Sequence, residues 1–430
     1  MPPREVLTKW LVGSVWPRAV EHRRAMTPLR PRTGRPQQAP TRRRAVLLVI
    51  GLVSALADSD PYAAQAYLHD ATARQQAVTL SVVSTDPYAN PDTYHRTQVE
   101  PETSSFGSTI VSAFQAGRSF EWGASNLGWS VSIDAGATWT DGFLPGTTVH
   151  ATPPGRWERV VDPSVAYDAK HDHWLMEGLG TRNLTGHRDR LFVSVSTDGA
   201  QTFGEPMIVA RADRSQIFDK NWITCDNSPT SPYYGNCYSA WDDDGHNLRL
   251  HAATSVDGGL TWTAASTPRR SRAFGVQPVV QSSGTVVMPT GCFPCFGSFV
   301  STDGGSTYRG PFAMPRINSR KVHGGLRMPL GLPSVDVDAA GTVYAVWHDC
   351  RFRHLGAGRH CLHNDIVMST STNGRRWSSV ARIPIDPRTG TVALAETRTR
   401  WTDPLRQVSD DQGQFSECVG QTEGWTDIGP

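Results

Sequence analysis

Short alternating runs of hydrophobic and polar residues fill most of this 430-residue chain. The runs are rich in Val, Thr, Tyr and Trp and are bounded by Gly, Pro and Asn, a pattern typical of short β-strands joined by turns. In residues 332–385, the segments LPSVDVDAAG, TVYAVWHD, DIVMSTSTNG and WSSVARIP predict four successive strands. Similar units are expected at 98–145, 155–210, 217–266 and 273–315. The pattern predicts an all-β protein built from four-stranded antiparallel units.

One turn motif recurs in every unit. The stretch TSVDGGLTWT at 254–263 follows S-x-D-x-G-x-x-W. The Asp and Ser side chains can bond turn amides, Gly tolerates positive φ, and the aromatic residue can pack under the turn. The residues that define the five copies are Ser132, Asp134, Gly136 and Trp139; Ser196, Asp198 and Phe203; Ser255, Asp257, Gly259 and Trp262; Ser301, Asp303, Gly305 and Tyr308; and Asn373 and Trp377. Four-strand units repeated at such intervals predict a β-propeller, in which these turns are structural.

The last expected blade is the least regular part of the repeat. Residues 391–430 contain no turn motif and little alternation. Either the sixth blade is degenerate or the chain ends before completing it. The segment AVTLSVVS at 77–84 predicts an extra strand that completes the last blade and removes an open sheet edge. We therefore expect a single six-bladed domain over 77–430.

The beginning of the chain reads as a targeting segment. TRRRAVLLVIGLVSALA at 41–57 joins a basic region to a short hydrophobic stretch, and small-residue cleavage patterns end at Ala57 or Ala66. This is typical of a secretory signal peptide within residues 1–66. A stable membrane span would need about 20 apolar residues. We predict a secreted protein that has no membrane anchor.

The charge and the cysteine content limit the kinds of partner and of cross-link that the chain can have. Residues 1–44 hold 11 of the 42 Lys and Arg residues but only two of the 40 acidic ones, so the rest of the chain is acidic and gives nucleic-acid binding no support. Seven cysteines in an exported chain favour disulfides. The local pairs are Cys225 with Cys237, Cys292 with Cys295, and Cys350 with Cys361, which leaves Cys418 over. Half of a zinc site is the alternative for the CFPC segment.

Polar residues gather at the end of the blades opposite the repeated turns. Meandering strands bring the starts of the first strands and the loops between second and third strands to that end. The candidate residues there are Glu100, Asp162, Asp219, Lys220, Arg118, Arg182, Asp349 and Arg351. Arginines beside carboxylates suit an anionic substrate flanked by acid–base groups. Solvated loops are the alternative, and the DDDG segment at 242–245 raises a calcium site as a further one.

The repeated S-x-D-x-G-x-x-W resembles the Asp-box, or BNR, repeat of sialidases over about residues 98–385. The phrases DPSVAYD and PYYGNCYSAW are similar to bacterial exo-α-sialidase-like proteins. The resemblance implies a sialidase-like six-bladed propeller and a retaining glycosidase with a tyrosine nucleophile, a Glu that activates it, an Asp acid/base and an arginine triad.

This sequence departs from the family pattern in two places. Arg382-Ile383-Pro384 follows the last box, whereas the family has this motif before the first. The tyrosine near the end of the family fold has no counterpart, so Tyr234, or its neighbour Tyr233, is the candidate nucleophile beside Glu100, Asp162 and Asp349. The candidate substrate-binding residues are Arg118, Arg182, Arg351, Asp219 and Lys220.

Two functions from different classes follow. The first is a secreted, monomeric, sialidase-like glycoside hydrolase that processes an anionic sugar without a cofactor. The second is a non-catalytic extracellular propeller that binds carbohydrate or protein. The missing early motif favours the second, and the convergence of Arg and carboxylates favours the first.

Overall fold

The computed structural model describes residues 81–94, 96–182, 190–268, 271–292, 295–319, 332–352 and 364–383. The chain divides into two compact units, Met1–Thr79 and Leu80–Pro430, and every described residue belongs to the second. The segments predicted to be a signal peptide and an irregular last blade at 391–430, and Cys418, lie outside the described residues. Secretion therefore stays a prediction.

The described strands form antiparallel meanders of four strands each. The first holds β1 (Gln98–Phe106), β2 (Thr109–Arg118), β3 (Ala124–Ser132) and β4 (Thr140–Phe143); the second β5 (Arg159–Asp168), β6 (His173–Thr181), β7 (Arg190–Ser196) and β8 (Met207–Arg211). The third holds β9 (Phe218–Cys225), β10 (Cys237–Asp243), β11 (Arg249–Ser255) and β12 (Thr263–Ala264), with the 3₁₀ turn η1 (Asp244–His246) after β10. The fourth holds β13 (Val279–Val280), β14 (Val286–Cys292), β15 (Cys295–Ser301) and β16 (Arg309–Ala313); the fifth β17 (Ser334–Val337), β18 (Val343–Asp349), β19 (Asp365–Ser371) and β20 (Ala381–Arg382).

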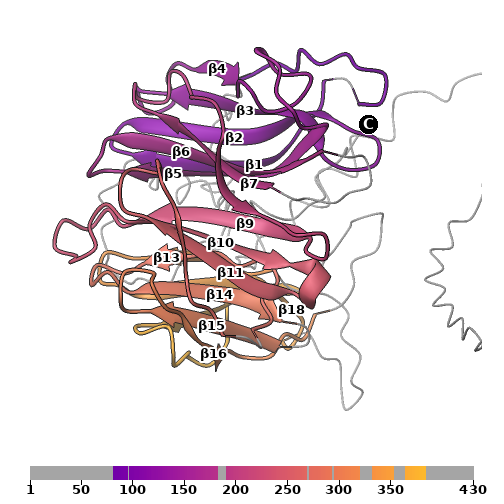
Figure 1. Ribbon diagram of the computed structural model, residues 1–430. Helices are drawn as coiled ribbons and strands as arrows, with labels where there is room; N and C mark the ends of the chain where they lie inside the picture. The colour runs from indigo at the N-terminus through magenta and orange to yellow at the C-terminus, as the bar shows by residue number, and fades with distance from the viewer. Residues whose placement is uncertain are drawn as a thin grey trace, which may run out of the picture. The chain divides into compact units, whose positions relative to one another are not determined.

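This strand pairing confirms the all-β fold and its four-stranded antiparallel sheets. The strands β9, β10 and β11 lie side by side in Figure 1, as their hydrogen-bonded register requires. One pair, Ala124 with Val160, joins the first meander to the second. The described strands fall inside the five units expected from the repeats, except that β8 extends one residue beyond the second unit, to Arg211. Closure into a ring and a count of six blades remain predictions.

Hydrophobic packing joins each meander to the next. Val111 and Trp129 of the first share a core with Met176 and Phe192 of the second, and equivalent cores lie between the second and third, third and fourth, and fourth and fifth. The first strands also contact one another in sequence, β1 with β5, β5 with β9, β9 with β13 and β13 with β17. Because central strands such as β3 are buried along their whole length, both faces of a meander need such partners.

The repeated turns share one hydrogen-bond pattern. In the third meander, Ser255 Oγ donates to Asp257 Oδ1, and the same Asp carboxylate accepts the backbone N–H and hydroxyl of Thr261. The turns at Asp134, Asp198 and Asp303 repeat these bonds. The Thr138 hydroxyl and backbone N–H lower the pKa of Asp134 to about 2. These carboxylates therefore hold turns together.

Gly259 shows why a small residue belongs in this turn. Its φ is +88°, and a Cβ there would lie 2.4 Å from Leu175 Cδ2 in the second meander. Close approach to the neighbouring sheet and left-handed backbone both favour glycine. In the second copy Ala200 takes the equivalent place at φ 64°.

Replacing Asp257 with Ala should lower the free energy of unfolding by about 2 kcal/mol, because several hydrogen bonds to a charged group are lost together. Asp257→Asn keeps one acceptor oxygen, as Asn373 does in the fifth copy, and should lose less. Chemical denaturation of the three proteins checks this order. An Asn variant as unstable as the Ala variant would contradict it.

The described residues confirm one predicted disulfide and contradict part of one predicted strand. The disulfide Cys225–Cys237 is confirmed, with an S–S distance of 2.06 Å. The extra strand predicted at 77–84 is wrong where the structure describes it, because residues 81–84 form no strand. Instead, Val83 O accepts a hydrogen bond from Ser130 Oγ on β3 of the first meander.

The other two predicted disulfides lie only partly within the described residues. Cys350 is disulfide-bonded, whereas its predicted partner Cys361 lies outside the described residues. Cys292 and Cys295 face each other in the β14–β15 register, and their side chains are not described. No helix in the described part of the chain is long and apolar enough to cross a membrane.

Candidate functional site

An unusual backbone conformation recurs near the start of three successive first strands. Glu100 in β1, Asp162 in β5 and Lys220 in β9 have φ angles of 54°, 51° and 48°. Each lies where the strand register shifts against its partner, as in a β-bulge. Left-handed backbone is uncommon for residues other than glycine and costs about 1–3 kcal/mol at each position. Because strained backbone of this kind clusters at functional sites, its repeat at one position of three meanders makes this region the candidate site.

Lys220 lies among the carboxylates that these bulges bring together. Its backbone N–H is 3.2 Å from Asp162 Oδ2 and 3.1 Å from Asp219 Oδ1. Burial by itself would lower the pKa of Lys220, but attraction by the carboxylates raises it above its usual value. The attracting residues, in order, are Asp162, Asp219, Glu100 and Asp242. The ammonium group therefore stays charged inside an anionic shell.

Glu177 lies behind this shell on β6. The residue is completely buried, and Asn221 Nδ2 donates both to Glu177 Oε1 (2.9 Å) and to the backbone oxygen of Asp162 (3.0 Å). Burial raises the pKa of Glu177 to about 7, although hydrogen bonds from Ser239 and Asn221 oppose the shift. Asn221 thus couples a carboxyl group that titrates near neutral pH to the bulge at Asp162.

Asp242 completes the group. It is fully buried at the end of β10, and neither carboxylate oxygen has a hydrogen-bond partner among the described residues. Burial raises its pKa well above the usual value, and repulsion by Asp219 and Asp244 adds to the shift. We name Glu100, Asp162, Glu177, Asp219, Lys220 and Asp242 the bulge cluster. It combines two carboxyl groups whose pKa burial raises, Glu177 and Asp242, with an ammonium and the carboxyl groups that attract it, a mixture suited to acid–base chemistry.

The bulge cluster presents only part of itself to solvent. Glu100 and Asp219 are partly exposed to solvent, whereas only 7% of the surface of Asp162 and 8% of that of Lys220 is exposed. Gln115 Nε2 holds the Glu100 carboxylate from β2. A substrate would therefore meet Glu100, Asp219 and the edge of Asp162 first, with Glu177 and Asp242 behind them.

Two of the predicted arginines have hydrogen-bond partners in the structure, and one of these partners is Asp349. Arg118 Nη1 donates to Gly123 O within its own β2–β3 loop, and Arg182 is exposed after β6. Arg351 donates two hydrogen bonds to the Asp349 carboxylate, from Nε to Oδ1 at 2.9 Å and from Nη2 to Oδ2 at 2.8 Å. Asp349 is buried and also accepts the backbone N–H of Asn318. Asp349 and Arg351 therefore satisfy each other within the fifth meander.

Tyr234 lies at the wrong end for the predicted nucleophile. It belongs to the turn between β9 and β10, at the Cys225 end of β9, whereas Lys220 is near the Phe218 end. Its neighbour Tyr233 donates its hydroxyl to Thr302 O in a repeated turn. The meander order places β1–β2-type turns with the repeated turns, which is why Tyr234 cannot join Asp162.

Two buried acids of the bulge cluster, Glu177 and Asp242, were not predicted to be catalytic residues. Glu177 lies inside β6, where HWLMEGLGT is otherwise apolar apart from its ends. A lone acidic residue in such a strand is the signal that could have identified it. Asp242 belongs to the strand CYSAWDD and not to a solvated calcium loop. No group of His, Cys, Asp and Glu side chains suited to a metal occurs in the described ranges.

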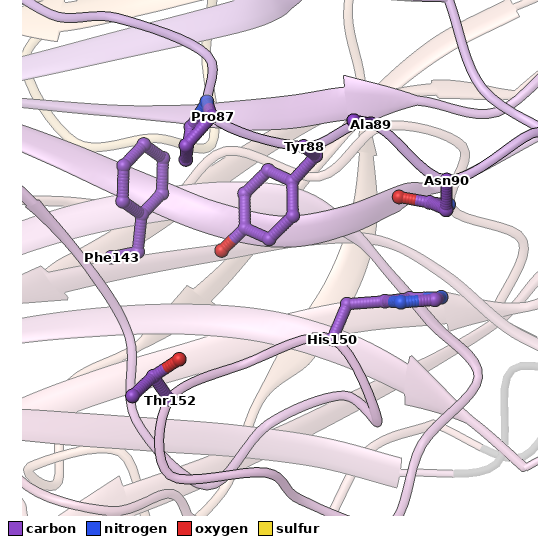
Figure 2. A pocket seen from close by; sticks show the side chains of 7 residues that line it. All are labelled: Pro87, Tyr88, Ala89, Asn90, Phe143, His150 and Thr152. Atoms are coloured by element: carbon purple, nitrogen blue, oxygen red, sulfur yellow. The ribbon is translucent and has the colours of Figure 1, made fainter.

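A separate pocket lies on the first meander. Its volume is about 610 Å³, and its lining combines the aromatic rings of Tyr88 and Phe143 with the polar side chains of Asn90, His150 and Thr152. Figure 2 shows Tyr88 between Phe143 and Asn90, with His150 beside Asn90. The rings of Tyr88 and Phe143 meet edge to face at 5.3 Å. Aromatic surface beside hydrogen-bonding groups suits a sugar ring.

Comparisons with solved structures find similarity to sialidases. A sialidase titled "Hadza microbial sialidase Hz136" is 17% identical at a TM-score of 0.46, and the match covers 66% of this chain and 58% of that one. A leech intramolecular trans-sialidase is 13% identical (TM-score 0.45; 71% and 63% covered), and a Trypanosoma rangeli sialidase bound to sialic acid is 15% identical (TM-score 0.46; 70% and 50% covered). The chain thus spans about three fifths of the first two proteins. No protein-family model and no curated protein matches the sequence. Similarity at this level assigns no activity.

Proposed function

We propose that this protein is a glycan-processing hydrolase whose acid–base chemistry uses the bulge cluster. The observation that carries the proposal is the repeated left-handed bulge at Glu100, Asp162 and Lys220, which costs backbone energy and brings charged groups together. Pairs of carboxyl groups with different proton affinities are the usual machinery for cleaving glycosidic bonds.

The roles follow from exposure and charge. Asp162 and Asp219 lie beside the ammonium of Lys220 and raise its pKa, and their carboxyl groups can accept a proton or stabilise a developing positive charge on a sugar ring. Glu177 does not reach the surface, and it acts as a positioning residue that holds Asn221 and, through it, the Asp162 bulge. Lys220 fixes the two aspartates in place.

The charge of the bulge cluster argues for a sugar without a carboxylate. Burial favours the acid form of Glu177 and Asp242, but Glu100, Asp162 and Asp219 still outnumber the single ammonium of Lys220, so an anionic substrate would be repelled. Two of the three arginines of the expected anion clamp, Arg118 and Arg351, donate to Gly123 O and Asp349, and the third, Arg182, is exposed after β6. We therefore propose a neutral or amine-bearing glycoside ahead of the anionic sugar that the sialidase resemblance implies.

The test is turnover of a fluorogenic glycoside panel by the purified full chain. The panel holds neutral hexosides, a hexosaminide with a free amine, and an α-sialoside. Asp162→Asn keeps a residue that tolerates left-handed backbone and removes the charge, so we expect about a 100-fold loss of kcat/KM. Asp172→Asn is the matched control, because Asp172 is an exposed aspartate at φ 57° outside the bulge cluster.

Three outcomes would change the proposal. Turnover that Asp162→Asn leaves intact would move the chemistry away from the bulge cluster. Turnover of the α-sialoside alone would restore the anionic substrate. No turnover on any member of the panel by the folded protein would favour the second candidate function.

That second candidate is carbohydrate binding without catalysis, and the pocket in Figure 2 is the observation that favours it. Binding of the same sugars on a glycan array, lost in Tyr88→Ala, would support it. Burial raises the pKa of Tyr88 to about 12, so the ring presents a neutral hydroxyl at neutral pH. Binding unaffected by Tyr88→Ala would exclude this pocket.

A further inference from the structure

A serine, a histidine and an aspartate line up beside the third meander, outside the bulge cluster. Ser215 Oγ lies 3.4 Å from His246 Nε2, and His246 Nδ1 lies 2.7 Å from Asp243 Oδ2. Ser215 belongs to the segment before β9, His246 ends η1, and Asp243 ends β10. Successive residues of a strand point to opposite faces, so Asp242 joins the bulge cluster while Asp243 faces His246.

The acid of this group is well placed to orient the histidine. Asp243 is completely buried, and its other oxygen accepts the backbone N–H of Ile217 at 2.9 Å. The His246 contact selects the tautomer with the proton on Nδ1, which leaves Nε2 to accept a proton from Ser215. His251 Nε2 also lies 3.5 Å from Asp243 Oδ2, and burial lowers the pKa of His251, so this second histidine stays neutral.

The serine is exposed and has two acceptors for its single proton. Ser215 Oγ lies 2.6 Å from Asp213 Oδ1, which also accepts the backbone N–H groups of Ser215 and Gln216. The Ser215 hydroxyl lowers the pKa of Asp213. At rest the proton therefore points to Asp213, and reaction requires it to turn to His246.

We propose that Ser215, His246 and Asp243 form a nucleophilic site that hydrolyses small esters. Ser215 Oγ attacks the ester carbonyl carbon while its proton passes to His246 Nε2. The bond to the alcohol oxygen then breaks, and the alcohol leaves with that proton. A solvent water next gives a proton to His246 and attacks the acyl-serine, which releases the carboxylic acid and returns the proton to Ser215.

The proposal does not depend on the function of the bulge cluster. Geometry of this kind is recognised by roles and not by order along the chain, and nucleophile–base distances are often long before substrate binds. Both His246 and Ser215 are accessible from solvent, so an ester group has a path to them.

The experiment is labelling of the full chain with a fluorophosphonate, followed by mass spectrometry of the labelled peptide. Attack by Ser215 Oγ forms an O–P bond and expels fluoride, while the proton goes to His246. We expect the label on Ser215, its absence in Ser215→Ala, and a rate about 100-fold lower in His246→Gln. Ser283→Ala is the matched control, because Ser283 is an exposed serine whose hydroxyl donates to Thr285.

A third variant separates the two acceptors. Asp213→Asn replaces an anionic acceptor with a neutral one and keeps the oxygen that the turn needs, so labelling should become faster. Loss of labelling in Asp213→Asn, no label on Ser215 in the wild type, or a rate unchanged in His246→Gln would each overturn the proposal. Circular dichroism establishes that every variant is folded.

Discussion

Lys220→Met should lower the free energy of unfolding by about 3–5 kcal/mol at pH 8, the usual cost of removing one partner from a buried set of charges. Asp162 and Asp219 would lose the ammonium group that they attract, and Asp242 would lose the charge that opposes its own protonation. Methionine fills a similar volume, so the loss reports charge and not a cavity.

The loss of unfolding free energy caused by Lys220→Met should be smaller at acid pH. Without the ammonium, the folded-state pKa values of the facing carboxylates rise, and groups with raised pKa lose stability as pH increases. Denaturant unfolding at pH 8 and pH 4.5 measures the effect. Lys170→Met is the control, because Lys170 is an exposed lysine and should change stability by less than about 0.5 kcal/mol. A deficit equal at both pH values would show that packing, not charge, explains the loss.

The sheets could be predicted because their signals are local. Alternation and turn chemistry are read within a few residues, and the bonds from Ser255 and Thr261 to Asp257 form inside one turn. The segment at 81–84 shows the limit of this reasoning. Its alternation suits a strand, but a strand also needs a partner edge, and Val83 meets a β3 side chain instead.

The candidate site was predictable only in part. Strand order places Glu100, Asp162, Asp219 and Lys220 at one end, and the structure brings these four together. A β-bulge could be suspected from the prolines of Val-Glu-Pro and Val-Asp-Pro, because proline in a strand is confined to edges and bulges, but not from the Asp-Lys-Asn of the third strand. The arginine clamp stays a prediction: Arg351 donates to Asp349 two residues away, and no sequence rule ranks that contact against a distant substrate.

The same reasoning explains the missed serine site. Ser215, Asp243 and His246 lie in a loop, a strand end and a 3₁₀ turn. Asp243 and His246 are three residues apart, so their pairing is local, whereas Ser215 is brought in by the antiparallel pairing of β9 with β10. A triad of this kind is visible only once the register is known.

Glu177→Gln should make the protein more stable than the wild type at pH 8, by about 3 kcal/mol. The pKa of Glu177 is raised by burial from 4.5 to about 7. Between these values the folded state holds a proton that the unfolded state has lost, so this contribution is fully present below pH 4.5 and disappears as pH rises through 7. The amide keeps the neutral shape and the acceptor for Asn221 at every pH.

The unfolding free energies of the wild type and of Glu177→Gln are measured at pH 4.5, 6 and 8. Their difference at each pH reports Glu177 alone, because all the other carboxyl groups are present in both proteins. One coupled change is expected: repulsion from Glu177 adds to the raised pKa of Glu102, so Glu102 should be slightly easier to ionise in the variant. Glu205→Gln, the same substitution at an exposed position, is the control. A Gln variant that is less stable at pH 8 would show that the ionised carboxylate supports the fold. If it is more stable and also less active, Glu177 is retained at an energetic cost, as expected for a residue that serves the site and not the fold.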